Sequence, residues 1–89
     1  MHISFDPNKE LLNIKNHGIS LQEAEKLEWD TFISHEDSRF AYGEYRLSGM
    51  GFIGLRLYVL VYVEYDDVHW RAISLRPATK QEMNYYAEA

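Results

Sequence analysis

The sequence predicts an α+β fold, with two N-terminal helices, a four-stranded and mostly antiparallel sheet, and one C-terminal helix. Three observations support this class. Helix-capping residues mark the first part of the chain, β-branched and aromatic residues alternate with polar ones over residues 31–77, and a second capping sequence follows. The chain has 89 residues, 46% of them hydrophobic, and no cysteine. We therefore expect a single domain over residues 1–89, stabilised by packing rather than by disulfides.

The N-terminal elements are delimited by caps. Residues 3–6 are expected to be extended. Asp6-Pro7 is typical of an N-cap followed by the first helical position, and it predicts a helix that runs to about Asn16. Gly18 is a suitable left-handed C-cap for that helix. The pattern Ser20-Leu21-Gln22-Glu23 is a capping box and predicts a second helix.

The second part of the chain has strand periodicity. Leu55–Val63 alternates between an aliphatic face and a largely aromatic face, so we expect a central strand covered on both sides. Asp66-Asp67 is interpreted as the turn of a hairpin. Thr79-Lys80-Gln81-Glu82 is another capping box and predicts a helix through Tyr86. The predicted strands are Thr31–His35, Ala41–Met50, Leu55–Tyr65 and Val68–Pro77.

Several classes of function are disfavoured. Gly49–Gly54 matches the dinucleotide fingerprint, but a strand rather than a helix is expected after it, so we interpret it as a glycine-rich hairpin loop. No apolar run approaches the ~20 residues of a membrane helix, and the N-terminus lacks the pattern of a signal peptide, so we expect a cytoplasmic protein. Neither a metal nor a cofactor is expected, because there is no cysteine and the histidines lack ligand spacing. These histidines are His2, His17, His35 and His69.

The charge is unevenly distributed. Fourteen acidic and nine basic residues give a net charge of −5, which argues weakly against sequence-independent nucleic-acid binding. Residues 45–62 and 68–80, however, contain Lys or Arg and no acid. If these two stretches pair in space, an acidic chain still presents a basic surface.

Strand alternation gives that surface a candidate site. It places Glu44, Arg46 and Ser48 on one face of their strand. In the last strand it separates Ala72, Ser74 and Arg76 from Arg71, Ile73 and Leu75, unless a bulge intervenes. If the faces coincide, Arg46, Ser74 and Arg76 form an anion cradle beside the last helix. The alternative is that each arginine pairs with a local acid, Arg46 with Glu44 and Arg76 with Glu82.

The first helix offers a second polar set. Lys9, Asn13 and His17 recur every fourth residue, and this places them on one stripe opposite Leu11 and Leu12. The plain interpretation is a solvated polar face above an apolar one. The functional interpretation is a cation, an amide and an imidazole presented together, a set that suits phosphodiester chemistry.

The chain resembles the BrnT family of ribonuclease toxins from Phe5 to Tyr86. The matching motifs are Phe5-Asp6 with Lys9 and Asn13, then His17-Gly18-Ile19-Ser20, then Gly43-Glu44-Tyr45-Arg46 with Gly49, and finally Arg71 to Tyr86 with Ile73-Ser74, Arg76 and Glu82. The resemblance implies a RelE-like fold and metal-free endoribonuclease activity on RNA. It also implies neutralisation by a BrnA-type antitoxin, which would make any contact with operator DNA indirect.

Metal-free RNA cleavage uses the substrate's own 2′-hydroxyl as the nucleophile, so the protein must move protons and stabilise a dianionic phosphorane. As a hypothesis we assign the catalytic roles to His17, Arg46, Arg76 and Glu44, with His17 as the leading proton carrier. The RNA-binding residues are expected to be Lys9, Asn13, Arg71, Ser74, Lys80 and Tyr86. Lower positive charge than the family pattern leaves a second hypothesis, a catalytically weak member that acts as an antitoxin-binding module.

Overall fold

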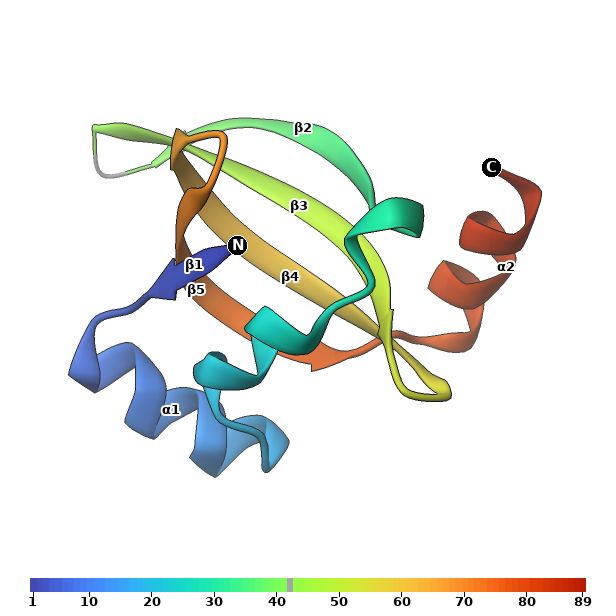
Figure 1. Ribbon diagram of the computed structural model, residues 1–89, viewed down its shortest axis with the longest axis horizontal. Coiled ribbons are helices and arrows are strands. Elements are labelled where there is room, and N and C mark those ends of the chain that lie inside the picture. The colour runs from blue at the N-terminus through green and yellow to red at the C-terminus, as the bar shows by residue number, and fades with distance from the viewer. Residues whose placement is uncertain (42) are drawn as a thin grey trace.

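The computed structural model describes residues 1–41 and 43–89, and for residues 36–41 it describes the backbone alone. A single five-stranded sheet in the order β1-β5-β4-β3-β2 organises the molecule (Figure 1), and the predicted α+β class is confirmed. The elements are β1 (His2–Ser4), α1 (Pro7–His17), the 3₁₀ helices η1 (Leu21–Lys26) and η2 (Trp29–Thr31), β2 (Ile33–Ala41), β3 (Glu44–Ile53), β4 (Arg56–Asp66), β5 (His69–Pro77) and α2 (Lys80–Glu88).

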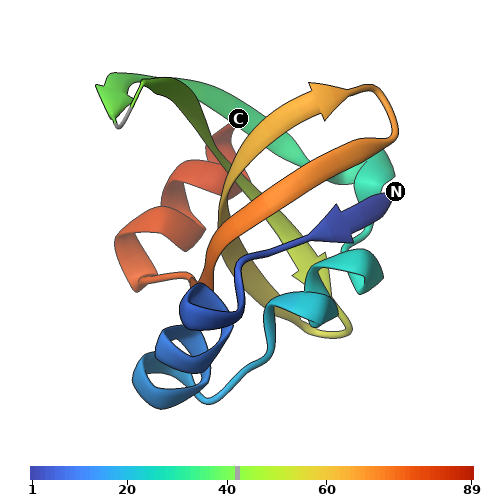
Figure 2. The same ribbon diagram turned by 90° about the vertical axis from the view of Figure 1, so that its left-hand side faces the viewer.

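The two faces of the sheet are covered by different elements. Figure 2 shows α2 on one face and η1 and η2 on the other, with α1 at the lower edge beside β5. The η1 face holds the larger core, in which Leu21, Leu60, Tyr62 and Leu75 are fully buried. The α2 face holds a smaller core of Met50, Leu57 and Val59. β4 is the middle strand of the five and is covered on both sides, as its pattern predicts.

The sheet has one strand more than predicted. Residues 2–4, expected only to be extended, form β1 and pair in parallel with His69–Arg71 of β5. β2 begins later than predicted and is longer, and Tyr42 of the predicted 41–50 strand lies outside the described residues.

The predicted second helix forms directly after Ser20, but it is the short 3₁₀ helix η1. Its buried residues Leu21 and Ala24, together with the capping residue Leu27, are spaced by three. A 3₁₀ helix has three residues per turn, so this spacing aligns all three side chains on one edge, whereas an α-helix would fan them out. The short, threefold apolar pattern therefore favours the tighter helix.

The start of η1 is capped differently from the prediction. The Ser20 hydroxyl accepts a hydrogen bond from the Gln22 N–H at 3.1 Å. The carboxylate that completes the cap belongs to Glu10 of α1 and not to Glu23. The Glu10 carboxylate accepts from the Leu21 N–H at 2.7 Å and from the Ser20 hydroxyl at 2.5 Å. This arrangement fixes α1 against η1. The caps predicted for α1 at Asp6 and Gly18 and for α2 at Thr79 are confirmed.

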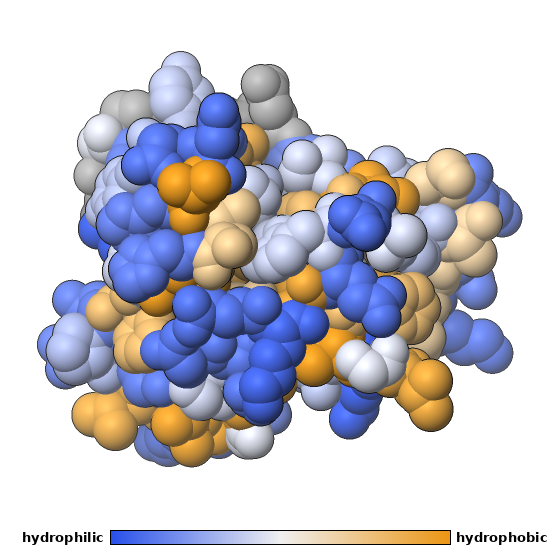
Figure 3. Space-filling view, in the orientation of Figure 1, coloured by the Kyte–Doolittle hydropathy of each residue, from blue (hydrophilic) through white to orange (hydrophobic). Residues whose placement is uncertain are grey.

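Helix α1 is turned the opposite way from the prediction. Asn13 of the expected polar stripe is 3% exposed, whereas Leu11 and Leu12 are 68% and 52% exposed. The Asn13 amide donates to the carbonyl of Leu75 at 2.8 Å and accepts from its N–H at 2.9 Å. β1 reaches only as far as Arg71, so the outer edge of β5 is open at Leu75, and Asn13 takes the place of a neighbouring strand. Figure 3 shows the resulting apolar surface along the lower edge, where α1 lies.

The two predicted turns are displaced. Gly49 and Gly51 belong to β3, and a β4 strand rather than a helix follows Gly54, as expected for a sequence that is not a dinucleotide motif. A Cβ at Gly49 would lie 2.2 Å from the Phe32 ring, so glycine is needed there for close packing. The last hairpin turns at residues 67–68, one residue later than predicted.

Within the part of the chain that the structure describes, no helix is long and apolar enough to cross a membrane.

Candidate functional site

The polar residues predicted on β3 and β5 share one face of the sheet. This is the face that α2 covers at one end, and we call it the α2 face. They are Glu44, Arg46, Ser48, Ser74 and Arg76. Ser48 and Ser74 both pair with Val61 of β4, one from each side, so their hydroxyls lie in one row across three strands. The predicted coincidence of the two faces is therefore observed.

A bulge in β5 adds another arginine to this face. Successive residues of β4 pair with Ser74 and then with Ala72, which leaves Ile73 as the extra residue. The register shift moves Arg71 to the side of Ser74 and turns Ala72 toward the η1 core, where it is 1% exposed. The prediction that Arg71 and Ser74 lie on opposite faces is therefore wrong for this strand. It applies to a strand without a bulge, and this strand has one.

Three cations line a small hollow beside this bulge, which we call the basic hollow. It has a volume of about 130 Å³ and is lined by Asp6, Lys9, Arg46, Arg71, Ala72 and Ile73. Nη2 of Arg71 donates to both carboxylate oxygens of Glu44, at 2.5 and 2.6 Å. Nε of Arg46 lies 3.9 Å from the same carboxylate. Lys9 makes no ion pair or side-chain hydrogen bond with the described residues, so its charge is available at the rim of the basic hollow.

Arg76 lies apart from these cations. The rows of Arg46 and Arg76 are separated by four residues along the strands, which corresponds to about 13 Å. Nη1 and Nη2 of Arg76 donate to the two carboxylate oxygens of Glu82 in α2, at 2.7 and 2.9 Å. These hydrogen bonds lower the pKa of Glu82 from 4.5 to about 2 and raise the pKa of Arg76. The predicted compact cradle does not form, and the local acid pairs of the alternative do.

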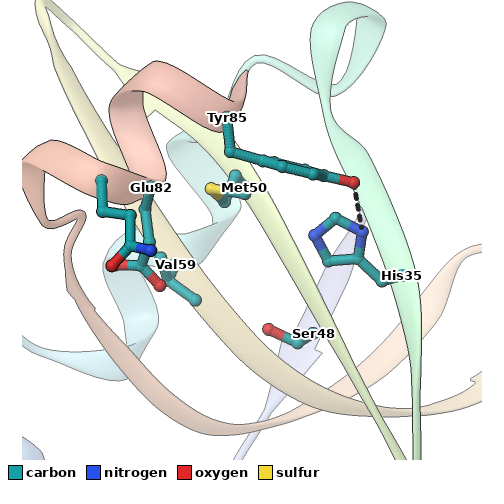
Figure 4. Close-up of a pocket in the computed structure, with 7 residues that line it drawn as sticks. His35, Ser48, Met50, Val59, Glu82 and Tyr85 are labelled. Carbon is teal, nitrogen blue, oxygen red and sulfur yellow. Dashed lines mark hydrogen bonds between the residues drawn. The ribbon is translucent and has the colours of Figure 1, made fainter. Parts of the chain in front are cut away.

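Between α2 and the sheet lies a larger cavity, which we call the α2 groove (Figure 4). It has a volume of about 410 Å³ and is lined by His35, Ser48, Met50, Val59, Gln81, Glu82 and Tyr85. Met50 and Val59 form an apolar floor, and both are nearly inaccessible to solvent. The Tyr85 hydroxyl lies 3.4 Å from Nδ1 of His35, and the two rings meet at 5.1 Å between centroids.

The remaining predicted residues are dispersed. His17 ends α1, exposed and without a side-chain partner among the described residues, about 12 Å along the helix from Lys9. Lys80 is exposed at the first position of α2. The Tyr86 hydroxyl donates to the Thr31 carbonyl at 2.8 Å, so this side chain fastens α2 to η2. Asn13 is committed to the backbone of β5, as described above.

Sequence reasoning missed the α2 groove. The sequence patterns point neither to His35, a histidine without metal-ligand spacing, nor to Tyr85. The pairing of His35 with Ser48 places the imidazole on the α2 face. The alternation of Ile33, Ser34 and His35 shows that Ser34 and His35 point to opposite faces of the sheet. Which of the two shares a face with Ser48 follows only from the register with β3. Among the described residues, no group of three or more histidine or acidic side chains could hold a metal ion.

Comparisons with known proteins identify the family. Residues 5–82 match the model of the ribonuclease toxin BrnT of type II toxin–antitoxin systems. The structure is similar to the crystal structure of the ribonuclease toxin BrnT from Brucella abortus, with a TM-score of 0.64 and 21% sequence identity over 90% of this chain and 99% of that one. The comparison with curated proteins found no similar sequence. The family match covers most of the chain and the structural match shows the same fold, and so this chain belongs to the BrnT family of ribonuclease toxins of type II toxin–antitoxin systems.

Proposed function

We propose that this protein is an endoribonuclease that cleaves RNA without a metal ion, and that a BrnA-type antitoxin neutralises it. The observation that carries the proposal is the basic hollow. Lys9, Arg46 and Arg71 come from three different elements and line this hollow together with Asp6, and the two arginines both lie against the Glu44 carboxylate. Groups that converge from separate elements can hold a phosphate in a fixed position, and this matters more for catalysis than the net charge of the whole chain.

The chemistry divides into charge stabilisation and proton transfer. In our proposal the 2′-hydroxyl of the substrate gives its proton to a base and attacks the adjacent phosphorus. The bond from phosphorus to the 5′-oxygen of the next nucleotide breaks, that oxygen takes up a proton as it leaves, and a 2′,3′-cyclic phosphate remains. The phosphorane between these steps carries two negative charges, and we assign their stabilisation to Arg46 and Arg71, with Lys9 guiding the strand. Arg71 uses only Nη2 on Glu44 and lies over the Tyr65 ring at 5.8 Å, so its Nε and Nη1 remain able to donate, with no hydrogen-bond acceptor among the described residues.

The proton carrier is reassigned on geometric grounds. His17 stands about 12 Å along α1 from Lys9, outside the basic hollow. Both carboxylate oxygens of Glu44 already accept hydrogen bonds from Arg71, so this carboxylate is occupied as a hydrogen-bond acceptor. His35 is the imidazole that faces the α2 face beside Ser48, and we assign proton transfer to it. Arg76 then acts as a positioning residue that holds α2 through Glu82 rather than as a contact to phosphate.

Of the other residues predicted to contact RNA, two keep that role in our proposal and two are given structural roles. Ser74 lies in the row between the α2 groove and the basic hollow, and Lys80 is exposed at the start of α2, so both are retained as contacts to the RNA backbone. Tyr86 and Asn13 are assigned structural roles, because their polar groups are bound to backbone atoms. We further propose a RelE-like class of fold, a cytoplasmic location, and contact with operator DNA only through the antitoxin.

Cleavage of a single-stranded RNA by the purified protein in EDTA tests the proposal. We expect cleavage to persist in EDTA and to fall by about 10²–10³-fold in Arg46→Ala and in Arg71→Ala. The matched control is Arg56→Ala, an exposed arginine at the start of β4 that has no partner among the described residues. Loss of cleavage in EDTA, or equal cleavage by all three variants, would contradict the metal-free mechanism at the basic hollow.

A second candidate function rests on the ion pairs. Arg71 and Arg76 are both bound to carboxylates, and the net charge is −5, so the chain is poorly suited to hold a polyanion tightly. These features favour a weakly catalytic protein whose main activity is to bind its antitoxin. A stable complex with the antitoxin, combined with no cleavage by the free protein at low salt, would support this candidate over the first.

A further inference from the structure

The α2 groove has the construction of a binding site for a flat, uncharged ring. Its volume of about 410 Å³ lies within the range of small-molecule sites. The floor is apolar, formed by Met50 and Val59. In Figure 4 the Tyr85 ring lies across the groove, seen edge-on, so that one flat face looks toward Ser48. An aromatic wall above an apolar floor with polar groups at the rim is the arrangement that unpaired bases of RNA occupy.

The charges of the groove favour a base over a phosphate. Glu82 lines it, and Arg76 holds this carboxylate in its ionised form, with both terminal nitrogens used. A phosphate in the groove would face a fixed negative charge and no available guanidinium. Gln81 is exposed at the rim, and its amide has no partner among the described residues, so it can donate to and accept from the edge of a base.

The surroundings supply a path for the RNA backbone. The Ser48 and Ser74 hydroxyls form the next row of the sheet, and the basic hollow follows one row further, about 7 Å along β3. A strand with one base in the groove can therefore pass its ribose over the two hydroxyls and present the adjacent phosphate to Arg46 and Arg71. His35 borders both the groove and this row.

We propose that the α2 groove binds one unpaired nucleobase of the RNA, stacked on Tyr85, and thereby places the neighbouring phosphate in the basic hollow. This inference rests on the proposed function for the identity of the substrate. It adds the prediction that the protein selects single-stranded RNA, because a paired base cannot enter the groove. It also predicts that Gln81 contributes to the choice of base.

Binding of a fluorescent 2′-O-methyl RNA hexamer tests the proposal without cleavage, because the nucleophilic hydroxyl is blocked. We expect Tyr85→Ala to weaken binding by about 5- to 150-fold, the range for loss of one stacked base. Tyr85→Phe keeps the ring and should bind like the unaltered protein. Tyr45→Ala is the matched control, because Tyr45 is also exposed but alternation places it on the other face of β3. Equal affinities for Tyr85→Ala and Tyr45→Ala would overturn the proposal.

A second measurement covers the case in which Tyr85→Ala loses its far-UV circular dichroism spectrum. Titration of the unaltered protein with the same hexamer, followed by NMR, should shift the ring signals of His35 and Tyr85, and unshifted signals at saturation would overturn the proposal. Cleavage of unmodified RNA is scored separately. Binding that depends on Tyr85, without cleavage, would refute the proposed ribonuclease activity and support the base site in the α2 groove. Cleavage combined with unaltered binding by Tyr85→Ala would support the ribonuclease activity and refute the base site.

Discussion

Replacement of Asn13 by alanine should destabilise the protein severely, although the residue lies on a surface helix rich in polar side chains. The structure gives the reason. The Asn13 amide makes three hydrogen bonds to backbone groups, two with Leu75 and one with the Ile19 carbonyl at 2.9 Å. Leu75 is fully buried, so water cannot replace the lost partner of its N–H or its carbonyl.

The expected magnitude follows from these groups. A buried polar group left unsatisfied costs about 1–3 kcal/mol, and Asn13→Ala leaves two of them on Leu75. Ile19 is only partly buried, and we count its carbonyl as rehydrated. The free energy of unfolding should therefore fall by about 2–6 kcal/mol, a large part of the 5–15 kcal/mol typical of a domain. Asn13→Asp should also destabilise, because its second oxygen would face the carbonyl oxygens of Leu75 and Ile19.

Urea denaturation followed by circular dichroism measures this difference. The matched control is Asn16→Ala, on the same helix but exposed and without a side-chain partner among the described residues, and it should change stability by less than about 0.5 kcal/mol. If Asn13→Ala unfolds at the same urea concentration as Asn16→Ala, the account of Asn13 as a substitute strand partner is refuted. Under conditions where Asn13→Ala is folded, it should cleave RNA, because the side chain does not reach the basic hollow.

Three further predictions follow from particular contacts. The pKa of Glu82 is about 2 in the folded protein and near 4.5 in the unfolded chain, so its contribution to stability is complete above about pH 5 and is lost as the pH falls toward 2. Between pH 5 and pH 2 the free energy of unfolding of Glu82→Gln should therefore fall less than that of the unaltered protein. Thermal melting of Leu11→Ser should be nearly unchanged, whereas Leu21→Ala should lose about 2–5 kcal/mol, and similar losses in both would place Leu11 in the core. Gly49→Ala should cost about 1–3 kcal/mol in urea denaturation, with partial recovery in combination with Phe32→Leu, and no recovery would contradict steric overlap with the Phe32 ring as the cause.

Local signals in the sequence were sufficient for much of the fold. The cap of α1 at Asp6, its end at Gly18 and the capping box at Thr79 all depend on residues within four positions of one another, and all are observed. The central position of β4 followed from its two apolar faces, which only a strand covered on both sides needs. Interactions of short range are encoded in short stretches of sequence, and so they can be predicted from them.

Errors arose where a residue's role depends on a distant partner. Periodicity alone assigns Leu11 and Leu12 to the core because they are apolar. The open edge of β5 at Leu75 demands a hydrogen-bonding partner, however, and Asn13 is the residue of α1 that supplies it. Two satisfied backbone groups in a buried position outweigh the exposure of two leucines, since the leucines lose only part of their apolar burial. No pattern within α1 reveals that demand, because it originates 62 residues away.

The bulge at Ile73 shows how the same limit affects the site. Arg71 and Arg76 are five residues apart, so in a regular strand they would point to opposite faces. The extra residue brings them to the same face, and there Arg71 meets Glu44 rather than standing alone. The carboxylate consumes one nitrogen of Arg71 but also fixes the direction of the guanidinium, and a fixed donor stabilises developing charge better than a mobile one. On this argument Glu44→Gln, which keeps the shape of the side chain but weakens the ion pair, should lower RNA cleavage more than it lowers RNA affinity. If the carboxylate merely repelled the substrate, its neutralisation would instead raise both the cleavage rate and the affinity for RNA.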